Sequence, residues 1–185
     1  MCKKSDIRMS IKDLKKNITA EERTRFSEQI RCRIEQLPEF KQAKTILLYH
    51  SLPDEVDSSS FLRLWKEDKR LLLPAVKGDN LIIRNYHPEK LKTGRYGIIE
   101  SQGDRITDLS VIDMIIIPGV AFDKKRNRLG RGKGYYDRFL SEFKGVTVGI
   151  CYTSCVQYGL PHGYFDRPVD ILVTENYIRR TEKKQ

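Results

Sequence analysis

Residues 121 to 137 contain the side chains and the glycine spacing most suited to chemistry in this sequence. The segment reads A-F-D-K-K-R-N-R-L-G-R-G-K-G-Y-Y-D and combines six Lys or Arg residues with glycine at positions 130, 132 and 134. Glycine permits backbone conformations that other residues avoid, so several N–H groups can converge on one anion. Because Arg131 and Lys133 supply charge between the glycines, the segment predicts a phosphate-binding loop.

An apolar run precedes this loop and indicates where it lies in the fold. Residues 114–117, M-I-I-I, are followed by Pro118 and Gly119 and predict a buried strand that ends just before the loop. Open α/β sheets bind ligands at such strand ends. Two familiar phosphate loops are excluded. Gly134 replaces the Ser or Thr of a Walker loop, and Tyr135 stands where a dinucleotide fingerprint has its third glycine.

The alternative for this segment is a flexible, solvated basic turn. A solvated turn does not explain why Tyr135, Tyr136 and Asp137 follow at the start of a predicted helix. The two tyrosines could, however, simply pack the first turn of that helix. An aspartate beside phosphate-binding amides is a typical place for Mg²⁺, which binds few carboxylates and takes phosphate oxygens as further ligands. We therefore predict that Asp137 lies in a magnesium–nucleotide site.

The run N-R-L-G-R-G-K-G-Y-Y-D, residues 127–137, resembles the signature of the 5-formyltetrahydrofolate cyclo-ligase family, also called 5,10-methenyltetrahydrofolate synthetases. Further blocks are similar to the family at residues 51–57 (S-L-P-D-E-V-D), at residues 95–100 (R-Y-G-I-I-E), and at Pro161 with residues 166–174. The resemblance covers nearly the whole chain.

The resemblance implies an ATP-dependent ligase that converts 5-formyltetrahydrofolate to 5,10-methenyltetrahydrofolate and releases ADP and phosphate. In that reaction the formyl oxygen attacks the γ-phosphate, and the neighbouring nitrogen outside the ring then closes the bridge. Catalysis of this kind depends on placing two reactants in line and on neutralising transferred charge. By matched position, Lys133 and Arg131 are the candidate catalytic residues, because they would stabilise the transferring phosphoryl group.

The resemblance also implies the binding residues. For ATP, as co-substrate, these are Lys4, Arg8, Arg128, Leu129, Gly130, Arg131, Gly132, Lys133, Gly134, Tyr135 and Tyr136. For the folate, which can carry a polyglutamate tail, they are Leu52, Asp57, Tyr96, Arg131, Gly132, Lys133, Gly134 and Tyr135. For the Mg²⁺ cofactor they are Asp137 and Asp166.

The local pattern gives three of these residues an alternative role. Lys4 and Arg8 lie one helical turn apart, which by spacing alone is typical of an exposed helix face. Asp57 stands where some family members carry Glu, so its shorter side chain is expected to reach the pterin through a water molecule. Asp is also a preferred helix N-cap, and capping a helix near Ser58 is the other role for Asp57.

The charge distribution favours anionic ligands. The formal net charge is +10, and residues 123–138 carry seven Lys or Arg against two Asp, which is half of that excess. ATP and polyglutamylated folates are polyanions that such a field attracts. Nucleic acid is the rival partner, but no zinc-finger, RNA-recognition or helix-turn-helix pattern occurs in the sequence. We therefore expect no nucleic-acid ligand.

The cysteines and the hydropathy favour a cytoplasmic enzyme, which we expect to be a monomer. Cys2, Cys32, Cys151 and Cys155 occur without a signal-peptide pattern, so we expect reduced thiols. The C-x-x-x-C spacing lacks the second ligand pair of a zinc site. No apolar run approaches the roughly 20 residues needed to cross a bilayer, so we expect no membrane partner.

Periodicity predicts helices and strands in βαβ order. A capping box at residues 19–22 begins a helix that ends before Pro38, and residues 58–68 and 135–143 predict two more helices. The predicted strands cover residues 45–49, 71–73 (ending at Pro74), 81–83, 114–117, 146–151 and 169–174. No repeat or linker divides the chain. We therefore predict one domain, residues 1–185, with an α/β fold of three layers (α/β/α) and a mostly parallel, Rossmann-like sheet.

Two other functions remain open from the sequence. A folate- and nucleotide-binding regulatory homologue without turnover would bind both ligands and leave ATP intact. A basic nucleic-acid-associated protein would bind DNA or RNA with a strong salt dependence. The unbroken run from Gly130 to Asp137 favours the enzyme.

Overall fold

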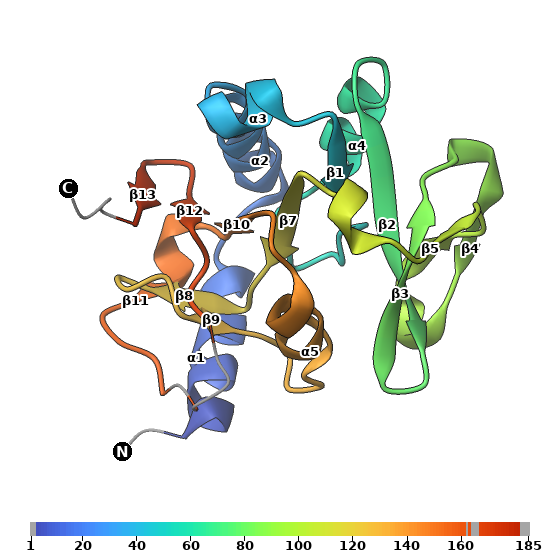
Figure 1. Cartoon of the computed structure of the whole chain (residues 1–185). Coiled ribbons are helices and arrows are strands. Elements are labelled where there is room, and N and C mark those ends of the chain that lie inside the picture. Colours follow the sequence, from blue (N-terminus) through green and yellow to red (C-terminus); the bar gives the residue numbers. More distant parts are fainter. Residues whose placement is uncertain (1–2, 162, 164–166, 182–185) are drawn as a thin grey trace.

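A computed structural model of the chain describes residues 3–161, 163 and 167–181 (Figure 1). The helices are α1 (Lys4–Lys16), α2 (Ala20–Glu35), α3 (Pro38–Gln42), α4 (Ser59–Trp65) and α5 (Tyr135–Glu142). The strands are β1 (Thr45–Leu47), β2 (Arg70–Lys77), β3 (Asn80–Asn85), β4 (Leu91–Thr93), β5 (Ile99–Ser101), β6 (Arg105–Ile106), β7 (Met114–Pro118), β8 (Ala121–Asp123), β9 (Arg128–Leu129), β10 (Val146–Ile150), β11 (Val156–Gln157), β12 (Ile171–Val173) and β13 (Ile178–Arg180).

The large sheet has the strand order β13-β12-β10-β7-β1-β2-β3-β6. Its central strands, from β12 to β2, pair in parallel, whereas β13 at one edge and β3 and β6 at the other pair antiparallel. In Figure 1 the strands from β13 to β3 follow one another from left to right, with α2, α3 and α4 above this row and α1 and α5 below it. The predicted α/β class and mostly parallel sheet are confirmed.

The core forms where the central strands are covered on both faces. Residues 115–117 of β7 are fully buried, as expected for a parallel strand with helices on either side. Ile30 and Ile34 of α2 are also fully buried. The predicted capping box starts this helix, because Thr19 Oγ1 accepts the Glu22 N–H and the Glu22 carboxylate accepts the Thr19 N–H.

The prediction that a strand ends at Pro74 is wrong. β2 continues through Pro74 to Lys77 and pairs antiparallel with β3. The ladder between β1 and β2 stops at the pair Leu47–Leu72, so the missing N–H of Pro74 breaks no hydrogen bond on that side. The two strands thus continue as a ribbon beyond β1, on the right of Figure 1.

A hairpin after β7 presents the glycine-rich loop. β8 and β9 pair antiparallel, and residues 130–134 then connect β9 to α5. Asp123 closes the hairpin: Oδ1 accepts the N–H groups of Lys125 and Asn127, and Oδ2 accepts the Asn127 amide and the Leu160 N–H. The hairpin therefore fixes the point at which the glycine loop begins.

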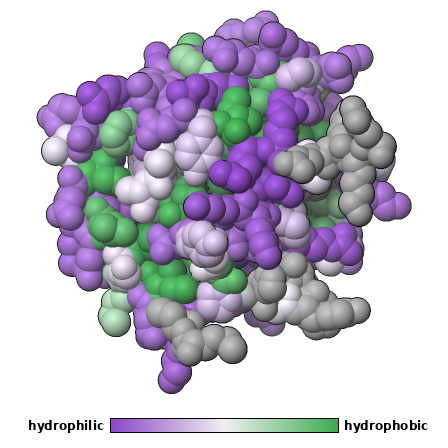
Figure 2. Space-filling view, turned by 90° about the vertical axis from the view of Figure 1, so that its left-hand side faces the viewer, coloured by the Kyte–Doolittle hydropathy of each residue, from purple (hydrophilic) through white to green (hydrophobic). Residues whose placement is uncertain are grey.

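Hydrophilic residues dominate one face of the molecule, and the described cysteines are free thiols. Figure 2 shows that hydrophilic residues cover most of the face on the left of Figure 1, with hydrophobic residues in groups between them. None of the described helices is long and apolar enough to cross a membrane. Cys151 and Cys155 are buried in the core, Cys32 is exposed, and all three are free thiols.

Candidate active site

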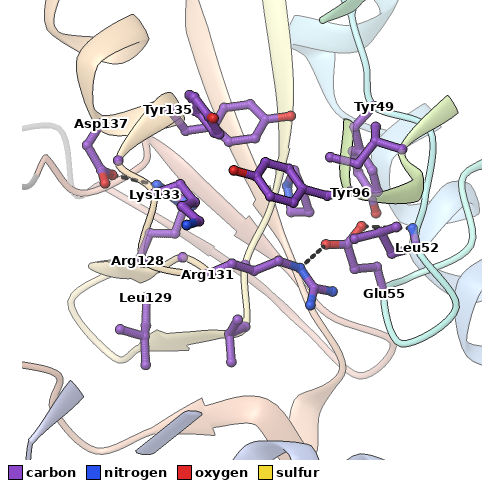
Figure 3. A pocket seen from close by; sticks show the side chains of 18 of the residues that line it. Tyr49, Leu52, Glu55, Tyr96, Arg128, Leu129, Arg131, Lys133, Tyr135 and Asp137 are labelled. Carbon is purple, nitrogen blue, oxygen red and sulfur yellow. Dashed lines mark hydrogen bonds and ion pairs between the residues drawn. The ribbon is translucent and has the colours of Figure 1, made fainter. Parts of the chain in front are cut away.

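A pocket of about 340 Å³ lies where the glycine loop, α1, the segment after β1 and the β2–β3 ribbon meet (Figure 3). Its volume is in the range of small-molecule sites. Of the residues predicted for ligands, Lys4, Arg8, Leu52, Tyr96 and all ten from Arg128 to Asp137 line it. Folding therefore brings most of the predicted site into one cavity.

The glycine loop adopts a backbone conformation that requires glycine. Gly132 has φ +96° and Gly134 has φ +69°, values that side-chain-bearing residues rarely adopt. Gly134 is also the N-cap of α5, so the loop leads directly into the first turn of that helix. Backbone N–H groups at a helix start have no partner within the helix and are suited to bind an anion.

Helix α1 brings two further cations to the loop. The Arg8 Nε donates a hydrogen bond to the carbonyl oxygen of Gly130 over 2.8 Å. The same guanidinium lies close to Gly132, where a Cβ would approach it to 3.4 Å. Lys4 lines the pocket one turn earlier. The face that carries Lys4 and Arg8 is therefore packed against the predicted phosphate loop.

Asp137, in the first turn of α5, contacts a cation of β9. Its Oδ1 lies 2.5 Å from Nη2 of Arg128, whose side chain is only 7% exposed. The Arg128 guanidinium also lies 5.3 Å from the centroid of the Tyr136 ring. No group of three His, Cys, Asp or Glu side chains suited to a metal occurs in the described part of the chain. Asp166, the other residue expected for the metal, lies outside the described residues.

Arg131 reaches across the pocket to the segment that follows β1 (Figure 3). Its Nε donates to Oε1 of Glu55 over 3.1 Å, and its Nη2 pairs with Oδ1 of Asp54. Partial burial works to raise the pKa of Asp54, but the hydrogen bond and charge of Arg131 outweigh it and lower that pKa. The candidate catalytic arginine is therefore held by two carboxylates.

Tyr96 forms an aromatic wall opposite Arg131. It has φ 61°, an uncommon left-handed conformation for a residue other than glycine, and is half exposed. Lys133 Nζ lies 5.5 Å from the centroid of its ring. Desolvation and a hydrogen bond with Tyr96 raise the pKa of Tyr135. In Figure 3 the Tyr96 ring lies between Tyr135 and Glu55, so the pocket joins aromatic surface to a cationic loop.

The basic window of the sequence divides in space. Arg128, Arg131 and Lys133 line the pocket, whereas Lys124 and Lys125 are exposed near the turn of the β8–β9 hairpin. The positive charge of the pocket therefore comes from two distant segments of the chain, α1 and the glycine loop.

The comparison with known families identifies the family of the chain. The model of the 5-formyltetrahydrofolate cyclo-ligase family matches residues 1–175. The chain belongs to this family. Of the run at residues 127–137, which resembles the family signature, residues 128–137 line the pocket.

Relatives in this family match over nearly their whole length. The 5-formyltetrahydrofolate cyclo-ligase of Haemophilus influenzae is 32% identical over 182 residues, covering 92% of this chain and 97% of that protein. The Escherichia coli enzyme of the same name is 31% identical, covering 91% and 98%. The solved structure of Aquifex aeolicus 5,10-methenyltetrahydrofolate synthetase has a TM-score of 0.89 at 39% identity, covering 98% of this chain and 94% of that one.

Asp57, whose carboxylate was predicted to contact the pterin, is not among the residues that line the pocket. Asp57 is exposed, and its carboxylate accepts hydrogen bonds from the Ser59 N–H and the hydroxyls of Ser51 and Ser59. The Asp57 carboxylate therefore lies at the start of α4, next to Ser58, which is the N-cap of that helix. Glu55 lines the pocket instead, because a turn from Leu52 to Glu55 directs its side chain inward.

Tyr49 and His50 are among the lining residues that sequence reasoning missed. Tyr49 is buried at the end of β1 and donates its hydroxyl to the Val56 carbonyl oxygen over 2.7 Å. His50 follows it, and its Nδ1 is buried without a hydrogen-bond partner among the described residues. Tyr49 ends the predicted strand and His50 follows it, and this place was the signal available in the sequence, since strand ends in α/β sheets face ligands.

Proposed function

We propose that this chain catalyses the ATP-dependent conversion of 5-formyltetrahydrofolate to 5,10-methenyltetrahydrofolate, with release of ADP and phosphate. The observation that carries the proposal is the contact between Arg131 of the family signature loop and Glu55 of the segment after β1. This contact places the glycine loop, proposed to bind phosphate, beside the Glu55 carboxylate, proposed to bind the pterin, in one pocket. Membership in the cyclo-ligase family supports the same reaction.

ATP is assigned to the side of the pocket formed by the glycine loop and α1. In this assignment the loop N–H groups and the start of α5 bind the phosphates, and Lys4, Arg8 and Arg128 add charge. Arg131 and Lys133 are assigned to the γ-phosphoryl group, because both lie in the loop and line the pocket. Guanidinium and ammonium groups aimed at a transferring phosphoryl stabilise the charge that develops there.

The folate is assigned to the side formed by Glu55, Leu52 and Tyr96. The pterin carries a 2-amino group and a neighbouring ring N–H, which together donate to a carboxylate. The Glu55 side chain is 11% exposed, and its Oε2 is already fixed by the Leu52 N–H over 3.0 Å. Its other oxygen is thus oriented into the pocket, and the Tyr96 ring offers a surface for stacking.

With the substrates in these positions, the reaction proceeds by phosphoryl transfer followed by ring closure. The formyl oxygen attacks the γ-phosphorus and ADP leaves, so the formyl carbon becomes activated by a phosphate group. The neighbouring nitrogen outside the ring then attacks that carbon and loses its proton. Phosphate departs as the bridge between the two nitrogens closes. The protein contributes by holding the two substrates in line and by surrounding the phosphoryl group with cations.

Mg²⁺ fits one residue of this pocket. Asp137 lines it beside the phosphate loop, and its carboxylate already attracts the Arg128 guanidinium. Mg²⁺ is held by one or two carboxylates together with substrate phosphates, so Asp137 would hold it with the nucleotide. When bound, the ion neutralises phosphate charge. Asp166 remains the second proposed ligand. We further propose a monomeric, cytoplasmic enzyme of one domain that binds no nucleic acid.

Turnover with defined components tests the proposed function. Purified protein is mixed with 5-formyltetrahydrofolate, MgATP and, in controls, with each component omitted in turn. Growth of the near-ultraviolet absorbance of methenyltetrahydrofolate only in the complete mixture is the expected result. A flat trace from folded protein that binds both ligands would instead identify a non-catalytic homologue.

A further inference from the structure

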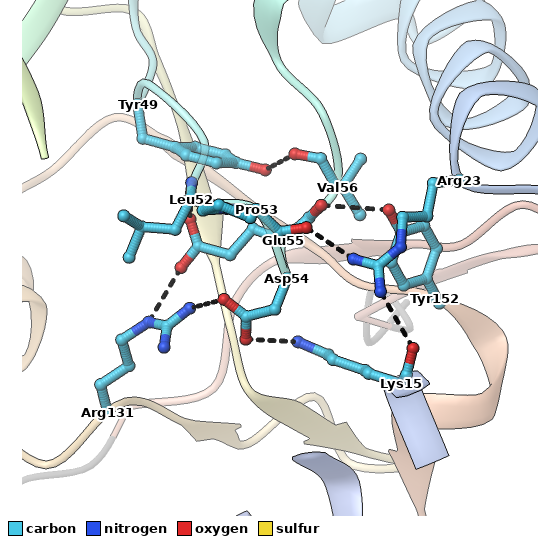
Figure 4. A network of polar contacts seen from close by, with 10 residues as sticks. All are labelled: Lys15, Arg23, Tyr49, Leu52, Pro53, Asp54, Glu55, Val56, Arg131 and Tyr152. Atoms are coloured by element: carbon cyan, nitrogen blue, oxygen red, sulfur yellow. Dashed lines mark hydrogen bonds and ion pairs between the residues drawn. The ribbon is translucent and has the colours of Figure 1, made fainter. Parts of the chain in front are cut away.

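Arg131 lies in a series of ion pairs that also includes residues outside the proposed substrate contacts (Figure 4). Its guanidinium is shared between Glu55 and Asp54. The second oxygen of Asp54 lies 3.6 Å from Nζ of Lys15, a residue of α1 that is only 4% exposed. Asp54 therefore links the phosphate loop to the helix that carries Lys4 and Arg8.

The backbone that carries the two carboxylates is held by hydrogen bonds, whereas the Arg131 side chain is partly exposed. The Tyr152 hydroxyl donates to the Glu55 carbonyl oxygen over 3.0 Å, and Arg23 Nη1 donates to the Pro53 carbonyl oxygen over 2.5 Å. These bonds fix the backbone on both sides of Asp54. The Arg131 side chain, by contrast, is 45% exposed and belongs to the glycine loop. If one partner moves when ligands bind, it is Arg131.

The same groups are required by both substrates. In the proposed function the pterin donates to the Glu55 oxygen that now accepts Arg131 Nε, and the γ-phosphate needs the Arg131 guanidinium. A pterin edge and a guanidinium are alike, since both present neighbouring N–H donors to a carboxylate. The folate and Arg131 therefore compete for Glu55, while Asp54 and the phosphate compete for Arg131.

We propose that Asp54 is a positioning residue which, with Glu55, holds Arg131 in a resting position, and that folate binding at Glu55 releases Arg131 toward the phosphate. The inference rests on the proposed function and deepens it. Folate thereby strengthens ATP binding, and ATP strengthens folate binding by the same factor. Once Glu55 is occupied by the folate, Arg131 keeps only an exposed pair with Asp54, whose charge is shared with Lys15.

The test measures binding of AMP-PNP, an ATP analogue that does not transfer its terminal phosphoryl group, by calorimetry with and without saturating 5-formyltetrahydrofolate. The ratio of the two dissociation constants is the coupling factor. Asp54→Asn should tighten AMP-PNP binding about two- to fivefold without folate, the range typical of an exposed ion pair, and much less with folate. The coupling factor should fall accordingly, and Asp54→Glu should restore it.

Control variants separate this mechanism from a general charge effect. Asp13→Asn removes the same charge from an exposed pair with Lys16 on α1 and should leave the coupling factor unchanged. Asp54→Ser is measured in parallel, so that the result does not depend on one variant folding. Equal tightening with and without folate would show a general charge effect and overturn the proposal.

The outcomes also separate this inference from the proposed function. Wild-type protein that binds both ligands without coupling, and still turns over ATP with 5-formyltetrahydrofolate, would refute the role of Asp54 and leave the function standing. Wild-type protein that binds neither ligand would refute both.

Discussion

Replacement of Lys133 by alanine should slow phosphoryl transfer about 100- to 1,000-fold while leaving the fold intact. Lys133 is an exposed residue of the glycine loop that lines the pocket, and its ammonium group lies 5.5 Å from the centroid of the Tyr96 ring. Removing the side chain therefore takes away a charge aimed at the nucleotide side of the cavity. It leaves no buried polar group behind.

The magnitude follows from where the charge would act. Two unit charges about 4 Å apart interact by about 1 kcal/mol in water and by about 4 kcal/mol in a partly enclosed protein site. The pocket is between these limits, so a loss of about 3 to 4 kcal/mol of transition-state stabilisation is expected. The fold loses only the contact with Tyr96, worth about 0.5 to 1 kcal/mol at an exposed site.

The assay compares Lys133→Ala with Lys125→Ala, which removes the same charge from the hairpin outside the pocket. Initial rates of methenyltetrahydrofolate formation are measured against ATP concentration, and urea unfolding checks the fold. We expect kcat to fall for Lys133→Ala and to stay within about twofold for Lys125→Ala, because surface substitutions away from a site have small effects. Lys133→Ala activity above one-tenth of wild type, or an equal loss in Lys125→Ala, would refute the reasoning.

Three further predictions concern stability and reactivity. Gly134→Ala should lower the unfolding free energy by about 1 to 2 kcal/mol in urea titrations, because φ is +69° there. Gly159 has open space around it and no positive φ, so Gly159→Ala should lower the unfolding free energy by less. The ion pairs of Asp54 should stabilise the fold above its unfolded pKa of about 3.9 and fade as pH falls through its lowered folded pKa. Asp54→Asn and wild type should therefore converge in stability at acid pH, and a constant difference would contradict this. Burial raises the pKa of Cys151 and of Cys155, so neither should react with a thiol reagent at pH 7 until urea unfolds the protein.

Local signals in the sequence were sufficient for the central parts of the fold. The isoleucine run at residues 115–117 is buried because a parallel strand between helices leaves no face for polar side chains. The capping box at Thr19 starts α2 because its two hydrogen bonds join residues three apart in the chain. The extent of β2 was harder to predict. Pro74 lies inside β2 because the neighbouring strand has already ended, which local sequence does not reveal.

In the candidate site, too, some features follow from the local sequence and others only from the tertiary structure. The sequence by itself determined the glycine loop, since left-handed backbone at Gly132 and Gly134 is a property of those residues, and it determined the family through the run that contains them. Only the tertiary structure decided that Glu55 faces the pocket while the Asp57 carboxylate lies at the start of α4. It also decided that Arg131 pairs with carboxylates 76 and 77 positions away. The physical reason is that turn geometry and long-range charge pairing depend on which segments the packed sheet brings together. The spacing of residues along the chain does not predict which segments these are.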